Sequence, residues 1–469
     1  MKALCLSAIL AAIPAMVSLP AQAEVKAWLT TPDRAHLLAP QPLPAAKPAR
    51  AGPVIRIDAT KRYQSMVGFG ASITDASAWL IGTRLDPAQR EALLAELYGT
   101  GEGQLGMSFT RLTIGASDFS RHHYSFDDMP KGESDPQLTR FSIDPNRSDV
   151  LPVVKAAFRL NPDLKVMASP WSAPAWMKTT DSLIKGRLRP EAYPAFAHYF
   201  VKYIRAYEAE GVPIFALTIQ NEPHFEPENY PGMRVEPAER AAFIGQHLGP
   251  LLRQEKIATQ IFDWDHNWDQ PESPMGVLAN PAARQYVSAV AWHCYAGDVT
   301  AQTPVHQAYP DKDVYFTECS GGEWAPKFEE SFPWFMKNLI IGSVNHGARG
   351  VLLWNLALDE AHGPHAGGCG DCRGVVTIDA RTGTVTRNLE YYALGHASRF
   401  VRQGAVRIAT SPVVGLDAVA FQNPDASLVL IVLNSGKTPT EFAVDMGGRR
   451  QGVTLPVGAA ITLVDTGRK

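Results

Sequence analysis

The sequence is poor in cysteine, in long apolar segments and in charge of one sign. It has 5 cysteines in 469 residues, too few for a fold built on disulfides, so a hydrophobic core must stabilise it. Beyond the N-terminal region no segment is long and apolar enough to be a transmembrane helix. There are 44 Lys and Arg residues against 47 Asp and Glu residues, with no long run of either sign. A nucleic acid is therefore not an expected partner.

Two further absences narrow the fold class. The sequence has no glycine-rich phosphate loop of the kind that marks a dinucleotide site, which argues against a doubly wound open sheet. It also has no solenoid-type repeat and no low-complexity tract. A large core is nevertheless available, because 45% of the residues are hydrophobic. Aromatic residues are numerous enough to supply a binding site as well.

The first 23 residues are typical of a secretory signal peptide. Lys2 precedes an apolar stretch over residues 4–19, and Ala21-Gln22-Ala23 fits the small-x-small cleavage pattern. A membrane anchor is the weaker alternative, because Pro14 and Pro20 interrupt a stretch already short for spanning a bilayer. We therefore expect a secreted or periplasmic protein, without an integral membrane segment in the mature chain. The sequence leaves the oligomeric state open.

Changes in composition divide the rest of the chain. A Pro- and Ala-rich stretch predicts an extended lead-in with little core of its own, and a strand-like segment follows it. A long section of alternating strand-like and helix-like segments comes next, and the chain ends in short strands separated by turn residues. The expected boundaries are 1–23 for the signal peptide, 24–53 for the lead-in, 54–61 for the strand, 62–396 for the catalytic domain and 397–469 for the C-terminal domain.

Eight short runs rich in β-branched residues alternate with helical patterns in the middle section. The predicted strands are Met66–Ile73, Leu105–Ile114, Leu164–Ser169, Ile214–Ile219, Thr259–Trp264, Tyr286–Trp292, Val314–Thr317 and Gly350–Trp354. The predicted helices between them include Pro87–Leu97, Arg189–Glu208, Pro237–Leu252 and Phe332–Asn345. This alternation and length predict a (β/α)8 barrel. The C-terminal segment predicts a side β-sandwich, to which the strand at Val54–Asp58 could be added.

Two carboxylates follow predicted barrel strands. Gln220-Asn221-Glu222-Pro223 follows the fourth strand, and Thr317-Glu318-Cys319-Ser320 follows the seventh. Reacting groups of such barrels lie at the carboxyl ends of the strands. Glycoside cleavage needs two carboxyl groups there, one protonated and one ionised. The placement of Glu222 and Glu318 fits this requirement, but a glutamate before proline at a strand end is often only a loop residue, and Glu318 alone is open to the same interpretation.

Other polar and aromatic residues at the strand ends have both a structural and a functional interpretation. Asp75 could simply cap a helix that begins at Ala76. Trp171 could be a packing residue, and His293 could be a core histidine with its hydrogen bonds satisfied. The functional interpretation is favoured because these residues fall at corresponding ends of successive predicted strands.

Four motifs together resemble glycoside hydrolase family 30, which includes lysosomal glucosylceramidases and bacterial and fungal β-1,6-glucanases. They are Gly68–Asp75, Ser169–Lys178, Gln220–Pro223 and Trp354–Leu358. The similarity extends from about Val54 to the C-terminus. It implies a (β/α)8 barrel with a side β-domain formed from both ends of the chain. It also implies a retaining double displacement on a carbohydrate or glycolipid, without cofactor or metal.

The resemblance also implies roles for individual residues. Glu222 would be the acid/base and Glu318 the nucleophile. The residues expected to line the sugar subsite are Asp75, Trp171, Asn221, His293, Tyr295 and Trp354. Among these, Asp75 would bind hydroxyls of the nonreducing sugar, and Asn221 would bind the 2-hydroxyl. A β-xylosidase, a β-fucosidase and a non-catalytic carbohydrate-binding barrel remain alternatives.

The sequence departs from the animal glucosylceramidases in a loop with two cysteines and at Cys294, so the leaving group stays open. In an exported protein a local disulfide between Cys369 and Cys372 is favoured. Together with nearby histidines, the same cysteines have spacing that could bind zinc instead. Cys294 and Cys319 follow neighbouring predicted strands and could form a second bridge or remain buried thiols.

Overall fold

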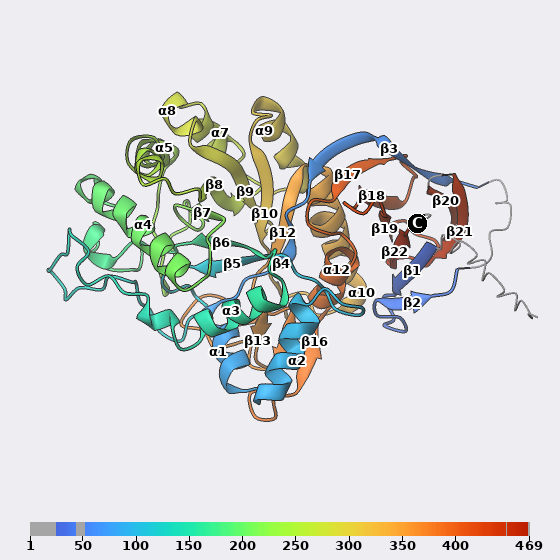
Figure 1. The fold of residues 1–469 in the computed structure, drawn as a ribbon, viewed down its shortest axis with the longest axis horizontal. Coiled ribbons are helices and arrows are strands. Elements are labelled where there is room, and N and C mark those ends of the chain that lie inside the picture. The colour runs from blue at the N-terminus through green and yellow to red at the C-terminus, as the bar shows by residue number, and fades with distance from the viewer. Residues whose placement is uncertain (1–24, 44–51, 447, 468–469) are drawn as a thin grey trace, which may run out of the picture.

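The computed structural model describes residues 25–43, 52–446 and 448–467. The predicted signal peptide, residues 1–23, lies outside these ranges. Within them, no helix has the length and apolarity needed to cross a membrane. A barrel and a β-domain lie side by side, and the long strand β3 (Val54–Ser65) runs between them (Figure 1).

Eight parallel strands form the barrel, and they confirm the predicted fold class. Each falls within or overlaps one of the eight predicted strand segments. Hydrogen bonds from Ser108 N to Phe69 O (3.2 Å) and from Ile73 N to Arg111 O (3.0 Å) join the first strand to the second and close the barrel. The strands are β4 (Gly68–Ala71), β5 (Phe109–Thr113), β6 (Lys165–Ser169), β7 (Ala216–Thr218), β8 (Gln260–Asn267), β9 (Val287–His293), β10 (Asp313–Glu318) and β12 (Ala348–Leu353).

Helices cover the outside of the barrel (Figure 1). The helix predicted at Pro237–Leu252 is divided by a π-helical turn at Ile244–Leu248, and a second π-helical turn covers Met336–Gly342. The α-helices are α1 (Asp75–Thr83), α2 (Pro87–Tyr98), α3 (Val150–Leu160), α4 (Tyr193–Ala209), α5 (Pro237–Phe243), α6 (Gly249–Gln254), α7 (Glu272–Leu278), α8 (Pro281–Arg284), α9 (Gln302–Ala308), α10 (Phe328–Phe335), α11 (Ser343–Asn345) and α12 (Leu389–Ser398).

The inside of the barrel changes from apolar to polar along the strands. Phe109, Phe262 and Tyr315 belong to a buried apolar cluster, with 4.4 Å between the stacked rings of Phe262 and Tyr315. Arg111 lies two residues after Phe109 on β5, and Thr317 two residues after Tyr315 on β10. Because side chains alternate along a strand, these polar residues share the interior face with the aromatic ones, one layer nearer the carboxyl end.

The β-domain is a nine-stranded sheet folded into two layers around its own apolar core. Strand β3 pairs with β17 and also with β20, so it connects the layers, and it includes the predicted strand at residues 54–61. The other strands are β1 (Val25–Thr30), β2 (Ala39–Gln41), β17 (Val406–Thr410), β18 (Leu416–Gln422), β19 (Leu428–Asn434), β20 (Thr440–Met446), β21 (Arg449–Leu455) and β22 (Ala460–Asp465). Strands β1 and β2 lie in the segment interpreted from the sequence as a lead-in with little core, and that segment therefore contributes to the β-domain.

The β-domain packs against α12 and against the barrel at the amino-terminal end of β12. The buried ring of His396 on α12 contacts Thr462 Oγ1 at 2.8 Å and Thr30 Oγ1 at 2.9 Å, so one helix residue touches strands from both ends of the chain. Arg349 Nε donates to Ser65 O at 3.0 Å at the base of β12. Short strands complete the fold beside the barrel mouth: β11 (Gly321–Gly322) pairs with β14 (Cys372–Arg373), and β13 (Ala357–Leu358), β15 (Val376–Ile378) and β16 (Val385–Arg387) form a small sheet.

Candidate active site

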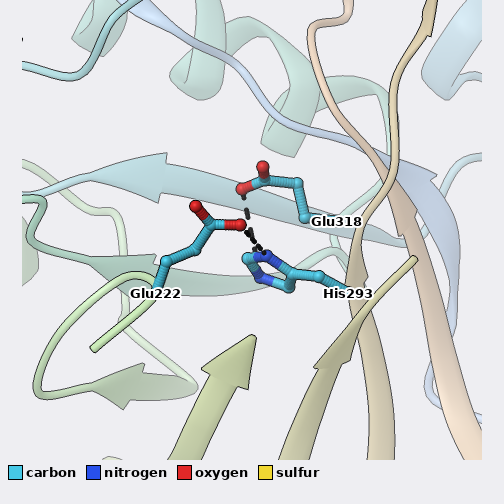
Figure 2. A group of neighbouring side chains, drawn as sticks. All are labelled: Glu222, His293 and Glu318. Atoms are coloured by element: carbon cyan, nitrogen blue, oxygen red, sulfur yellow. Dashed lines mark hydrogen bonds and ion pairs between the residues drawn. The ribbon is translucent and has the colours of Figure 1, made fainter. Parts of the chain in front are cut away.

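Two glutamates face each other at the carboxyl end of the barrel (Figure 2). Glu318 is the last residue of β10, and Glu222 lies in the loop after β7. One carboxylate oxygen of each, together with a ring nitrogen of His293, lie within 4.8 Å of one another. The structure thus brings together the two carboxylates that the sequence placed at strand ends.

The backbone at Glu222 is held in an unusual conformation. Its φ is 47°, a left-handed value that costs a residue other than glycine about 1–3 kcal/mol. Its N–H donates to the carbonyl of Asp265 at 3.0 Å, and its own carbonyl accepts from Phe225 N–H at 2.9 Å. These bonds stabilise the loop conformation that directs the side chain toward His293.

Glu318 is held by a cation and a phenol. Arg111 Nη1 forms an ion pair with Glu318 Oε2, and Tyr295 Oη donates to Glu318 Oε1 at 3.0 Å. Only 5% of Glu318 is exposed. Because a buried carboxylate needs hydrogen-bond or ion-pair partners, these two contacts stabilise the side chain of Glu318 in its position.

Arg111 connects Glu318 to a buried polar network beneath the site. Its Nη2 donates to Asn221 Oδ1 and to Asp265 Oδ2, both at 2.7 Å. Asp265 also accepts from Thr317 Oγ1 at 2.8 Å. Despite burial, the positive charge of Arg111 and hydrogen bonds from His293 and Ser169 hold the pKa of Asp265 well below its usual value. Asp265 therefore remains an anion that balances Arg111.

His293 lies between the buried anion and Glu222. One ring nitrogen is 2.9 Å from Asp265 Oδ1, and the other is 3.1 Å from Glu222 Oε1. Burial alone would lower the pKa of His293, but the charge on Glu318 and hydrogen bonds to Asp265 and Glu222 raise it to about 9. We therefore expect His293 to be protonated at neutral pH.

Glu222 is in a different electrostatic situation from Glu318. Burial raises the pKa of the Glu222 carboxyl above its usual value, and the neighbouring charge of Glu318 acts in the same direction. The hydrogen bond and charge of His293 oppose this rise without cancelling it. A raised pKa suits a group that must carry and release a proton.

Aromatic side chains form a wall beside the carboxylates. The rings of Trp171 and Trp354 are stacked with centroids 5.0 Å apart, and both are buried. The guanidinium carbon of Arg111 lies 4.8 Å from the Trp171 ring centroid and 5.6 Å from that of Trp354. The two tryptophans predicted for the sugar subsite therefore lie at the site, as do Asn221 and Tyr295.

The carboxylate of Asp75 is bound by an arginine. Its Oδ1 accepts from Arg121 Nε at 2.9 Å, and Arg121 Nη2 also donates to Asp149 Oδ2 at 2.7 Å. Asp75 is the first residue of α1, but the N-terminal cap is Thr74, whose hydroxyl accepts from Ser77 N–H at 3.2 Å. The helix-cap interpretation is therefore wrong. Asp75 is bound to Arg121 rather than to Glu222 or Glu318.

Three charged residues of the site were not predicted from the sequence: Arg111, Asp118 and Asp265. An arginine inside an otherwise apolar predicted strand was a usable signal for Arg111, because charged residues are rarely buried without a partner. Asp265 follows the fifth predicted strand, but nothing in the sequence indicated its bond to Arg111. Asp118 lies in a long loop after β5 and carried no signal.

Asp118 is a buried carboxylate next to the site. Its Oδ1 is buried and has no hydrogen-bond partner within the described ranges. Burial, with the charges of Glu318 and Glu222, raises the pKa of Asp118 well above its usual value. Since an unsatisfied buried acceptor destabilises a fold by about 1–3 kcal/mol, Asp118 is suited to bind a hydroxyl of a ligand.

A family model for the glycosyl hydrolase family 30 TIM-barrel domain matches residues 66–401, and a model for the β-sandwich domain of that family matches residues 404–463. The chain belongs to glycosyl hydrolase family 30. It is therefore a glycosyl hydrolase, and it acts on carbohydrate substrates.

Relatives of this family 30 chain include glucanases and glucosylceramidases. An endo-1,6-β-D-glucanase of Neurospora crassa is 36% identical over 80% of this chain and 79% of its own. The lysosomal acid glucosylceramidase of Mus musculus is 28% identical over 82% of this chain and 77% of its own. A solved endo-β1,6-glucanase superposes with a TM-score of 0.86 at 32% identity, over 94% of this chain and 99% of that structure.

Two disulfides flank the site of the family 30 chain. Cys294, after β9, is bonded to Cys319, after β10, with Cα atoms 5.4 Å apart. Cys369 is bonded to Cys372 within one loop, with Cα atoms 5.6 Å apart. The local disulfide favoured from the sequence is therefore present. The zinc interpretation of this loop is wrong, because a cysteine in a disulfide cannot bind zinc as a thiolate.

Glu222, His293 and Glu318 also have the donor types of a cation site. Their surroundings argue against that use. Arg111 already pairs with Glu318, and a His293 whose pKa is raised to about 9 is protonated and cannot donate a lone pair to a metal. The family 30 chain thus supplies positive charge here from its own side chains.

Proposed function

We propose that this protein is an exported, retaining β-glucoside hydrolase whose substrate is a β-1,6-linked glucan. The observation that carries the mechanism is the distance of at most 4.8 Å between one carboxylate oxygen of Glu222 and one of Glu318. Retaining enzymes have carboxyl groups about 5–5.5 Å apart, whereas inverting enzymes need about 6.5–9.5 Å to admit water. The greater identity to endo-1,6-β-glucanases than to the mouse glucosylceramidase supports the substrate. The signal-peptide pattern at residues 1–23 supports export.

In the first step Glu318 is the nucleophile. Its ionised carboxylate attacks the anomeric carbon, and the bond from that carbon to the leaving oxygen breaks with its electron pair. Arg111 and Tyr295 hold the two oxygens of Glu318 in place before attack. The product of this step is a covalent glycosyl-enzyme ester at Glu318.

Glu222 transfers the proton in both steps. In its protonated form, which the raised pKa favours, it donates a proton to the leaving oxygen. When the glycosyl-enzyme has formed, the charge on Glu318 is lost and the pKa of Glu222 falls. Glu222 then accepts a proton from the water molecule that attacks the anomeric carbon and releases Glu318.

The residues around the carboxylates bind the sugar. Trp171 and Trp354 contribute apolar faces, and Asn221, held by Arg111 at 2.7 Å, contacts the 2-hydroxyl. Asp118 binds further hydroxyls with its unpartnered Oδ1. Asp75, whose carboxylate is oriented by Arg121, binds hydroxyls of the nonreducing sugar as expected from the resemblance.

Product analysis with the purified mature enzyme tests this function. We expect oligosaccharides from β-1,6-glucan, with the β anomer of the new reducing end appearing first in time-resolved NMR. Glucose released from glucosylceramide or aryl β-glucosides, with the polymer left intact, would instead indicate an exo-acting glucosidase. Activity on β-xylosides or β-fucosides alone would contradict the glucan assignment, and an α anomer as first product would contradict retention.

A further inference from the structure

A cavity adjoins the proposed catalytic centre. Its volume is about 390 Å³, and the disulfide Cys294–Cys319 and the ring of Tyr295 form the wall nearest the carboxylates. Because the hydroxyl of Tyr295 donates to Glu318 at 3.0 Å, a single ring separates the nucleophile from the cavity. Tyr295 therefore belongs to both the cavity and the proposed catalytic centre.

Three aromatic residues of this cavity are unusually exposed. Trp324 is 54% exposed, Tyr295 44% and Trp334 43%. Only seven large hydrophobic residues in the described part of the chain are exposed, so nearly half of them line this one cavity. Large aromatic residues are usually buried, and exposed ones gathered in one place indicate a binding surface.

The indole of Trp324 packs against the backbone on one face and is otherwise exposed. Its six-membered ring occupies the space beside Gly322, where a Cβ atom would lie 2.0 Å from Trp324 Cζ3. Gly322 belongs to β11, which pairs with β14 in the loop that carries the second disulfide. One face of the indole therefore packs on backbone, and the exposed remainder is available to a ligand.

Polar groups accompany these aromatic rings. Arg373 lines the cavity and is fixed by the buried Glu390, whose carboxylate is 3.0 Å from Arg373 Nη2. Ser320, Glu330 and Ser331 also line the cavity. Among the described residues of the lining, only Ala325 has an aliphatic side chain. An acyl chain would pack best against branched aliphatic side chains, whereas a sugar presents C–H faces to aromatic rings and hydroxyls to charged groups.

We propose that this cavity binds a second glucosyl unit of the substrate, adjoining the unit at the catalytic centre. Trp324 and Trp334 contact the faces of that sugar, and Arg373 donates hydrogen bonds to its hydroxyls. This inference rests on the proposed function and extends it, because it explains how a glucan rather than a simple glucoside is selected. Trp324 and Trp334 are then specificity-determining residues that do not touch the reacting atoms.

The test compares a substrate that leaves the cavity empty with one that fills it. β-Glucosyl fluoride has a leaving group of one atom, and a β-1,6-linked glucotriose extends into neighbouring sites. We expect Trp324→Ala to lower kcat/KM by about tenfold more on the trisaccharide than on the fluoride, since loss of an aromatic anchor commonly costs this much. Most of the change should lie in KM, and Trp324→Phe should recover part of it.

Tyr63→Ala is the matched control, because Tyr63 on β3 is a comparably exposed aromatic residue, at 49%, in a strand of the β-domain. Equal losses on both substrates, or none on either, would overturn the inference. It would also be overturned if the loss appeared with long-chain alkyl glucosides and not with the trisaccharide. Isothermal titration of the trisaccharide into Glu318→Gln, with and without Trp324→Ala, gives a binding readout that does not require hydrolysis. Failure of the proposed function, seen as absence of turnover on any glucoside, is thereby separated from failure of the cavity assignment.

Discussion

The two carboxylates of the site have opposite surroundings, although both stand at ends of strands in the same barrel. Glu318 is bound by the cation Arg111 and by the hydroxyl of Tyr295, and a disulfide joins its neighbour Cys319 to Cys294. Glu222 lies in a loop with a left-handed backbone, and its contacts are with His293 at 3.1 Å and, more distantly, His266 at 3.9 Å. The first environment stabilises a fixed anion, and the second raises the pKa of a group that exchanges a proton.

This difference shows how one barrel provides two chemical roles with the same side chain. The role follows from the partners and not from the residue type: Arg111 and Tyr295 bind Glu318, whereas at Glu222 burial and the charge of Glu318 outweigh the effect of His293 on the pKa. Four changes to the molecule test or refine this comparison.

The largest effect is expected from Glu318→Ala, which removes the fixed anion. We expect a loss of activity on the order of 10⁵-fold or more on all substrates, because removing a nucleophile costs about this much in other enzymes that act through covalent intermediates. Hydrolysis of glucan and of aryl β-glucoside measures it. Added azide should restore turnover and give the α-glycosyl azide, since azide would attack from the side that Glu318 occupies. A β-azide would contradict the assigned role.

Glu222→Ala should have a smaller effect that depends on the leaving group. General acid catalysis contributes about 10²–10⁴-fold, and an activated aryl glycoside needs little protonation. We therefore expect strong loss on β-1,6-glucan and much less loss in the first step on a dinitrophenyl β-glucoside, measured as a burst of phenolate. Azide should here give the β-glycosyl azide. Equal losses on both substrates would show that Glu222 is not the acid.

The two disulfides should contribute unequally to stability. Cys294 and Cys319 are 25 residues apart, and Cys369 and Cys372 are 3 apart. In the chain-entropy account the longer loop is worth about 3.5 kcal/mol and the shorter about 2 kcal/mol. Thermal denaturation should therefore show a larger loss for the Cys294→Ser/Cys319→Ser double variant than for Cys369→Ser/Cys372→Ser, its matched control. A larger loss of stability for the Cys369→Ser/Cys372→Ser variant would contradict the larger contribution assigned to the Cys294–Cys319 disulfide.

The smallest effect is expected from His293→Gln, as a shift in the alkaline limb of the pH–rate profile. His293 holds the pKa of Glu222 down against burial, so His293→Gln should raise that pKa further. Because activity needs protonated Glu222, the alkaline limb should move to higher pH. The rate of the variant should also be lower at every pH. His266→Gln is the control, since burial and the charge of His293 lower the pKa of His266 to about 2 and leave it neutral. A shift to lower pH in the His293 variant would contradict this assignment.

Much of the barrel could be predicted, because its signals are local. Short β-branched runs such as Val287–His293 alternate with helical patterns, and each strand needs only its own residues to be recognised. The β-domain was harder. Strands β1 and β2 lie in a segment rich in proline and alanine. β1 is a strand because it pairs with β22 from the far end of the chain, and β2 pairs in turn with β1.

The sequence alone determined the fold class, the family and the two strand ends that carry Glu222 and Glu318, because these depend on periodicity and on short contiguous motifs. Only the tertiary structure decided what surrounds the two carboxylates. Arg111, Asp265 and Glu318 come from β5, β8 and β10, more than a hundred residues apart at the extremes, and meet only when the barrel closes. The same closure places Asp118 beside the two carboxylates, where burial and the charges of Glu318 and Glu222 raise its pKa. Charge and burial act through distances in space, which no contiguous pattern records.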